Sequence, residues 1–219
     1  MNLKKNRPKN NIVIFSFFGA WPDFVDFDLR LFKNLQESGN SVKILKCDKA
    51  LPFCDQSMSY KKVFNTDYKK TCQICTDSLT ERLGILRTIV DLDPSNLISL
   101  EEYAKSLAVE CFYKDHATLN PVDFIKKYYS KCIRIGLNMT AIANNTKLSI
   151  SYIMRLIDPD ITKSISQLFL SSLIMHDAMN NLIDELDRHG DLPNCFIFTH
   201  SHRSLMSVLQ KILEQRKIK

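Results

Sequence analysis

Four of the seven cysteines in this 219-residue chain lie close together in the sequence, at Cys47, Cys54, Cys72 and Cys75. The Cys72-x-x-Cys75 spacing can present two sulfurs to one metal ion, and Cys47 and Cys54 could complete a tetrahedral thiolate site. Thiolate ligands favour zinc or an iron–sulfur centre. Such a site would order a long loop, because the free energy of metal binding becomes free energy of folding. A redox or disulfide pair and unliganded thiols are the alternatives that the spacing leaves open.

The segment before these cysteines has the pattern of a strand, a helix and a second strand. Residues 12–18 form an apolar run that Gly19 ends, and residues 42–45 form another that leads into Cys47. Between them the spacing of Leu29, Phe32 and Leu35 predicts a helix, with Asp28 on its polar side and Gly39 after its last turn. This βαβ pattern predicts two parallel strands. Ligands of open α/β sheets bind beyond the carboxyl ends of the strands, and the cysteine-bearing loop leaves from that edge.

The remainder of the chain is mostly helical in pattern. Helices are expected from about Thr76, from the capping box at residues 99–102, from Pro121 and, as the longest, from Pro159 to Gly190. A short strand at 195–198 and a last helix follow. The fold class predicted is α/β, a small Rossmann-like parallel sheet with flanking helices and a helical insertion. Residues 1–10 form a flexible tip, and one domain spans 11–219, with a cysteine-bearing loop at 48–76 and the insertion at 99–150.

Composition excludes several classes of function. A net charge of +6 owes much to the two basic ends, and the aromatic residues are not interleaved with a basic face, so nucleic-acid binding is not expected. No apolar run approaches the roughly 20 residues of a transmembrane segment. The five glycines form no Gly-rich phosphate loop. An odd number of cysteines and the lack of an export signal disfavour a secreted disulfide protein.

In their order along the chain, several stretches resemble the N-terminal domain of bacterial surface-polysaccharide glycosyltransferases, of the capsule or O-antigen type. These enzymes are of the GT-B kind, with two Rossmann domains. The stretches that carry the resemblance are residues 41–47, 51–54, 72–75, 133–137 and 195–203. Two departures weaken it. Relatives often carry an Asn-Gly-Arg-like turn where this chain has residues 199–203, so only Arg203 could correspond, and the second domain, which normally binds the nucleotide sugar, is not found in this sequence.

The resemblance implies sugar transfer from a nucleotide sugar to a glycan or lipid-linked acceptor, in the cytoplasm and peripheral to the inner membrane. The chain would supply the acceptor side, and a second domain or subunit would bind the nucleotide-sugar donor. The candidate catalytic residues are Asp23, Asp26 and His200, and the candidate substrate-binding residues are Gly19, Trp21, His202 and Arg203. Each has a structural alternative: Trp21 would pack on the domain, and the carboxylates and histidines would cap helices.

A different class of function fits the same sequence. The chain could be a non-enzymatic binding module, stabilised by metal at its cysteines, that docks to a partner subunit. An exposed apolar helix face would favour this interpretation. A thiol redox protein is a third interpretation, and it requires Cys72 and Cys75 to be exposed and unliganded.

Overall fold

The computed structural model describes most of the chain outside its two longest connections. The described residues are 9–16, 19, 21–51, 68–90, 92–104, 122–123, 126–127, 140, 142–144, 146–147, 161–199 and 203–218. Within residues 68–69, 161–166 and 203–209 only the backbone is described. Most of the predicted insertion at 99–150 and much of the predicted loop at 48–76 therefore lie outside the described residues.

The centre of the molecule is a four-stranded sheet in the order β3-β2-β1-β4, and all three pairings are parallel. The strands are β1 (Asn11–Phe15), β2 (Ser41–Lys46), β3 (Leu97–Ser99) and β4 (Cys195–Phe198). The expected α/β class with a Rossmann-like parallel sheet is confirmed. Strand β3 was not predicted, because three residues are too few to establish a period-2 pattern.

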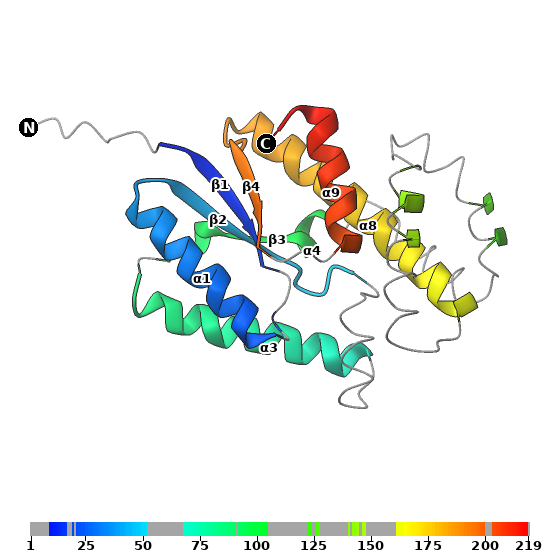
Figure 1. Ribbon diagram of the computed structural model, residues 1–219, viewed down its shortest axis with the longest axis horizontal. Helices are drawn as coiled ribbons and strands as arrows, with labels where there is room; N and C mark the ends of the chain where they lie inside the picture. The colour runs from blue at the N-terminus through cyan, green and yellow to red at the C-terminus, as the bar shows by residue number, and fades with distance from the viewer. Residues whose placement is uncertain are drawn as a thin grey trace, which may run out of the picture.

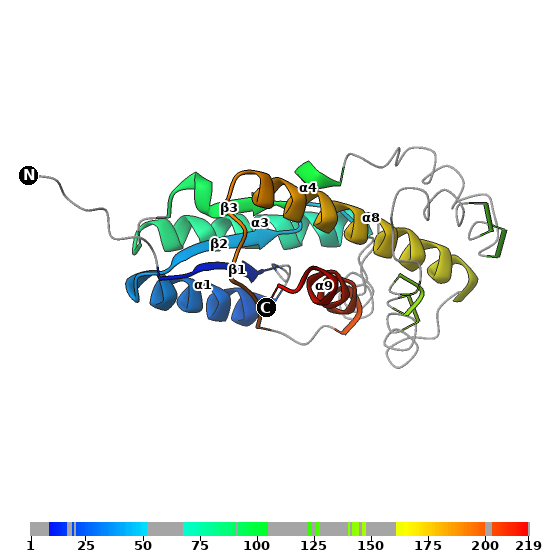
Figure 2. The ribbon, with the colours of Figure 1, turned by 90° about the horizontal axis from the view of Figure 1, so that it is seen from above.

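Helices cover both faces of the sheet, which is the usual arrangement for parallel strands. The described helices are α1 (Pro22–Glu37), α3 (Tyr68–Arg87), α4 (Leu100–Tyr103), α8 (Ile161–Arg188) and α9 (Arg203–Arg216), with the 3-10 turn η1 (Pro94–Asn96). Helices α1 and α3 lie on one side of the sheet, and α8 and α9 on the other (Figure 1). The first part of α8 extends past the carboxyl ends of the strands, as Figure 2 also shows.

Alternating residues of the central strand serve the two layers. Val13 and Phe15 of β1 belong to the apolar cluster that includes α4, α8 and α9, while Ile12 and Ile14 belong to the cluster with α1 and α3. All four side chains are buried. Each large apolar side chain that is fully buried contributes about 1.5–3 kcal/mol of transfer free energy. Strand β1 therefore contributes to both layers, as does β2 with Leu45 on one side and Val42 and Ile44 on the other.

Two predictions about the helices need correction. The helix expected from Thr76 begins at Tyr68, so Cys72 and Cys75 lie on α3 and not in a loop. Asp28, expected on the polar side of α1, is fully buried. Other predictions are confirmed: Gly39 and Gly190 both adopt positive φ just after a helix, where glycine costs least.

Gly19 brings the loop after β1 directly onto α3. A Cβ at this position would overlap the carbonyl oxygen of Cys75 and lie 3.0 Å from Cβ of Leu79. Because backbone atoms of a helix cannot move aside cheaply, only glycine permits this approach.

We expect Gly19→Ala to lower the free energy of unfolding by about 1–3 kcal/mol, as in other overpacked sites. The matched control is Gly84→Ala, because a Cβ on Gly84 would meet no atom within 4 Å and Gly84 lies inside α3. Alanine should stabilise that helix by roughly 0.5–1 kcal/mol. Urea unfolding of both variants gives the measurement, and equal stability of the Gly19 variant and the parent would contradict the packing described.

Candidate functional site

The topology defines one special place on the carboxyl edge of the sheet. The chain leaves β1 toward β2 on one side, and β4 is added later on the other side. Ligands of open α/β sheets bind where the strand order reverses in this way. In the pairing of β1 with β4, Phe15 lies opposite Phe198, so Ser16 and Thr199 are the residues that directly follow these two neighbouring strands. These two residues mark the candidate site.

The buried carboxylate of Asp28, on α1, makes a hydrogen bond to this edge of the sheet. Thr199 Oγ1 donates a hydrogen bond to Asp28 Oδ1 of α1, and Asp28 is fully buried. Asp28 shares its helix face with Val25, Leu29 and Phe32, which are also buried. Burial of a carboxylate is costly unless hydrogen bonds satisfy it, so its presence in an otherwise apolar face points to a specific role. The contact fixes the start of the β4–α9 connection to α1.

Sequence reasoning missed Asp28, although a signal was present. The positions 25, 28, 29 and 32 follow the i, i+3, i+4, i+7 spacing of a buried helix face. A polar residue within that spacing could have been recognised as a buried functional or structural group.

Ser16 adds a hydroxyl to the same edge. Its backbone N–H donates to the carbonyl oxygen of Leu45 at 3.0 Å, which extends the sheet by one step. Its side chain is fully buried, and among the described residues its Oγ has no hydrogen-bond partner. Buried hydroxyl groups nearly always have a hydrogen-bond partner, so Ser16 Oγ is suited to form a hydrogen bond with a ligand.

The predicted residues of the first loop have distinct surroundings. Trp21 precedes the first turn of α1, is partly buried, and packs against the larger apolar cluster and against Phe24, with ring centroids 6.4 Å apart. Asp23 is exposed in the first turn of α1. Asp26 forms an ion pair with Arg82 of α3, so its carboxylate faces the neighbouring helix. Gly19, Trp21 and Asp23 thus stay near the edge of the sheet, and Asp26 does not join them.

The predicted residues after β4 are described only in part. His200 and His202 lie outside the described residues, and Arg203 is the first residue of α9, with its side chain outside them as well. Helix α9 therefore begins shortly after the candidate edge. The amino end of a helix favours negatively charged groups.

Three of the four clustered cysteines lie around the end of β2 and the first turns of α3. Cys47 directly follows β2, and Lys49 Nζ donates to Gln73 Oε1 at 2.6 Å, which joins the exit of β2 to the helix that carries Cys72 and Cys75. Burial raises the pKa of Cys47 to about 12, and the nearby thiols of Cys75 and Cys72 contribute to the rise. Its thiol is therefore protonated at neutral pH.

Metal binding by these residues needs more than the described side chains. Among the residues that the structure describes, no three His, Cys, Asp or Glu side chains are arranged to hold a metal ion. Cys54, the remaining member of the cluster, lies outside them. A complete thiolate site would need Cys54 or a shift of the loop that follows Cys47.

One histidine of the described core has a structural role. His176 of α8 is buried, and its Nδ1 lies 2.9 Å from Nδ2 of Asn180. Burial lowers the pKa of His176 to about 4, with a smaller contribution from Arg216. The ring is therefore neutral at pH 7 and packs as part of the core.

Comparisons with protein-family models, with curated proteins and with solved structures found no match to this chain. Among the described residues, no helix is long and apolar enough to cross a membrane. Function is therefore inferred from the fold and from the geometry of the sheet edge.

We expect the Asp28–Thr199 contact to show strong energetic coupling. In a double-mutant cycle with Asp28→Ala and Thr199→Val, either single change removes the hydrogen bond that Thr199 donates to the buried carboxylate, and the coupling should reach about 1–2 kcal/mol. The control cycle uses the exposed pair Lys33–Glu37, 3.8 Å apart, where the coupling should stay below about 0.5 kcal/mol. Denaturant unfolding measures both, and equal coupling in the two pairs would refute the role given to Asp28.

Proposed function

We propose that this chain is the acceptor-side domain of a glycosyltransferase-type protein of bacterial surface-polysaccharide synthesis. The observation that carries the proposal is the juxtaposition of Ser16 and Thr199, supported by buried Asp28, where the strand order reverses. Hydroxyl and carboxylate groups at such an edge suit a polyhydroxyl ligand, because sugars both donate and accept hydrogen bonds. The ligand class proposed is a glycan or lipid-linked acceptor.

The residues around this edge have complementary roles in the proposal. Trp21 offers an aromatic surface at the amino end of α1, and exposed Asp23, two residues later in the first turn, would act as the general base toward an acceptor hydroxyl. His200, His202 and Arg203 follow β4 in the sequence, and Arg203 opens α9. A donor phosphate would be bound there, with the nucleotide sugar held by a second domain or subunit. The location proposed is the cytoplasm, peripheral to the inner membrane.

The only tryptophan of the chain is Trp21, which provides a direct test. We expect oligosaccharide fragments of bacterial surface polysaccharides to change its fluorescence in a saturable way. Thr199→Val should weaken this binding about tenfold, because one hydrogen bond near a buried carboxylate is lost.

The matched control is Thr88→Val, on a part of the molecule away from this edge. The hydroxyl of Thr88 is exposed and donates to the nearby carbonyl oxygen of Ile85. That variant should bind as the parent does. The proposal fails if no saccharide in the panel changes the emission, or if Thr199→Val binds as tightly as Thr88→Val.

A second candidate function is a metal-stabilised binding module that docks to a partner subunit. The observation that favours it is that Cys47 follows β2 where the Lys49–Gln73 hydrogen bond joins the exit of that strand to α3, the helix that carries Cys72 and Cys75. Metal would displace the thiol proton, because the thiolate is the ligand. The proposed ligands are these three cysteines and Cys54, with zinc or an iron–sulfur centre as the bound group.

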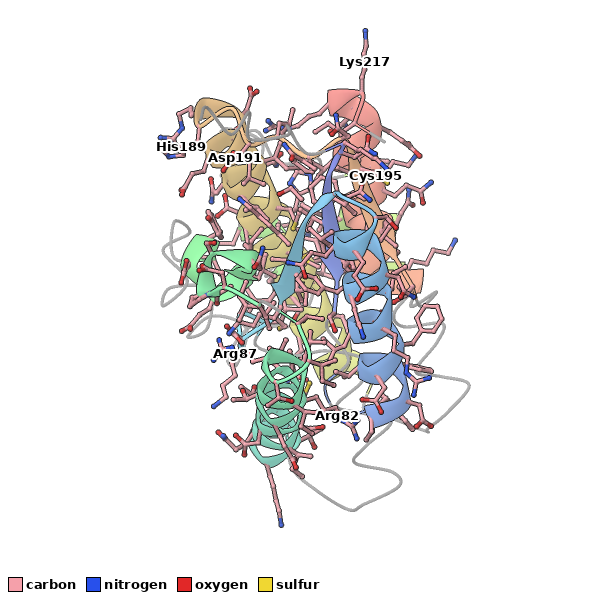
Figure 3. The ribbon with its side chains drawn as sticks, turned by 90° about the vertical axis from the view of Figure 1, so that its left-hand side faces the viewer. Arg82, Arg87, His189, Asp191, Cys195 and Lys217 are labelled. Atoms are coloured by element: carbon pink, nitrogen blue, oxygen red, sulfur yellow. The ribbon has the colours of Figure 1, made fainter. Side chains whose placement is uncertain are left out.

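Elemental analysis of untagged protein prepared without chelator tests this candidate. We expect about one zinc, or stoichiometric iron, per chain, and its loss in Cys72→Ser, because a tetrahedral thiolate site cannot spare a ligand. The control is Cys195→Ser, since Cys195 lies at the amino end of β4 (Figure 3), whereas Cys47 follows the carboxyl end of β2. Metal-free protein with four reactive thiols in the cluster would remove this candidate.

A further inference from the structure

A groove between α1 and α3 is separate from the sheet edge described above. It has a volume of about 320 Å³ and an apolar floor made by Leu29 and Leu86. Ile85 of α3 and Ile89, in the turn just after α3, form its wall, and their side chains are 56% and 59% exposed. Both isoleucines line the groove, so they extend its apolar surface.

The groove is lined by more positive than negative charge. Arg30, Lys33 and Arg82 line it together with a single carboxylate, Asp26, which is paired with Arg82, while Lys33 forms an exposed ion pair with Glu37, 3.8 Å away. Figure 3 shows Arg82 between the two helices. The excess is local, because α1 and α3 as a whole carry six Lys or Arg and six Asp or Glu residues. This helical layer would therefore attract a flat anionic bilayer only weakly. A negative group inside the groove would be attracted more strongly.

We propose that the groove binds an anionic amphiphile, a single hydrocarbon chain that ends in a phosphate or carboxylate. The chain lies along Leu29, Leu86, Ile85 and Ile89, and the head group contacts Arg30, Lys33 and Arg82. Guanidinium groups bind such heads through paired hydrogen bonds. The volume falls within the range of small-molecule pockets, about 300–1,000 Å³. This proposal does not depend on sugar transfer at the sheet edge.

Dodecyl phosphate is the probe, titrated calorimetrically into the full chain below its critical micelle concentration. We expect one molecule to bind per chain, at least about tenfold more tightly than dodecyl maltoside, which has the same alkyl chain without the charge. Butyl phosphate, which keeps the head and shortens the chain, should bind at least about tenfold more weakly than dodecyl phosphate, because most of the apolar contact is lost.

Variants locate the site. The double variant Arg30→Gln, Lys33→Gln should weaken dodecyl phosphate binding at least about tenfold, and Ile89→Gln should weaken it as well. All three side chains lie on the surface groove, so the fold should persist. The control is Arg87→Gln, because Arg87 lies on the side of α3 that faces away from α1 (Figure 3).

Three results would overturn the proposal. The first is equal binding of dodecyl phosphate and dodecyl maltoside, and the second is an equal effect of the Arg87 and the Arg30–Lys33 changes. The third is binding of an acidic amphipathic helical peptide at these residues without binding of dodecyl phosphate, which would assign the groove to a protein partner.

Discussion

The structure depends on β1 being an inner strand of a parallel sheet. Each residue from Ile12 to Phe15 pairs with β2 on one side and β4 on the other, and both of its faces are covered. A parallel strand cannot be joined to its neighbour by a tight turn, so the chain must cross the sheet each time, and each crossing supplies a covering helix. The first crossings place α1 and α3 on one face, and the return to β4 places α8 on the other (Figure 1).

The candidate site is a direct consequence of that arrangement. Strands β2 and β4 lie on opposite sides of β1, and the carboxyl ends of β1 and β4 adjoin without a helix between them. Ser16 and Thr199 are the residues that follow these two strand ends. Asp28 is what makes this edge unusual, since α1 buries a carboxylate where a leucine would stabilise the core more simply. Its bond from Thr199 ties the β4–α9 connection to α1, so the geometry of the edge is set by residues far apart in the chain.

Sequence patterns were reliable where they were long and local. The βαβ unit and the long helix α8 follow from periodicity, and Gly39 and Gly190 follow from the need for positive φ. Strand β3 was missed because its three residues gain stability only from pairing with β2, which is a non-local contact. The burial of Asp28 could have been inferred from its spacing with Val25, Leu29 and Phe32, whereas the start of α3 depends on tertiary contacts. The pairing of Asp26 with Arg82 could not be predicted for the same reason, since no local rule brings α1 and α3 into register.

Helix α3 connects features that were treated separately above. Its early part carries Cys72 and Cys75 and contacts Gly19 of the loop that leads to Trp21. Its middle pairs with α1 through Arg82, and its last turn and the turn that follows line the groove with Ile85 and Ile89. Because Gly19 leaves no space at the carbonyl oxygen of Cys75, the position of α3 and the path of the loop at the sheet edge are set together.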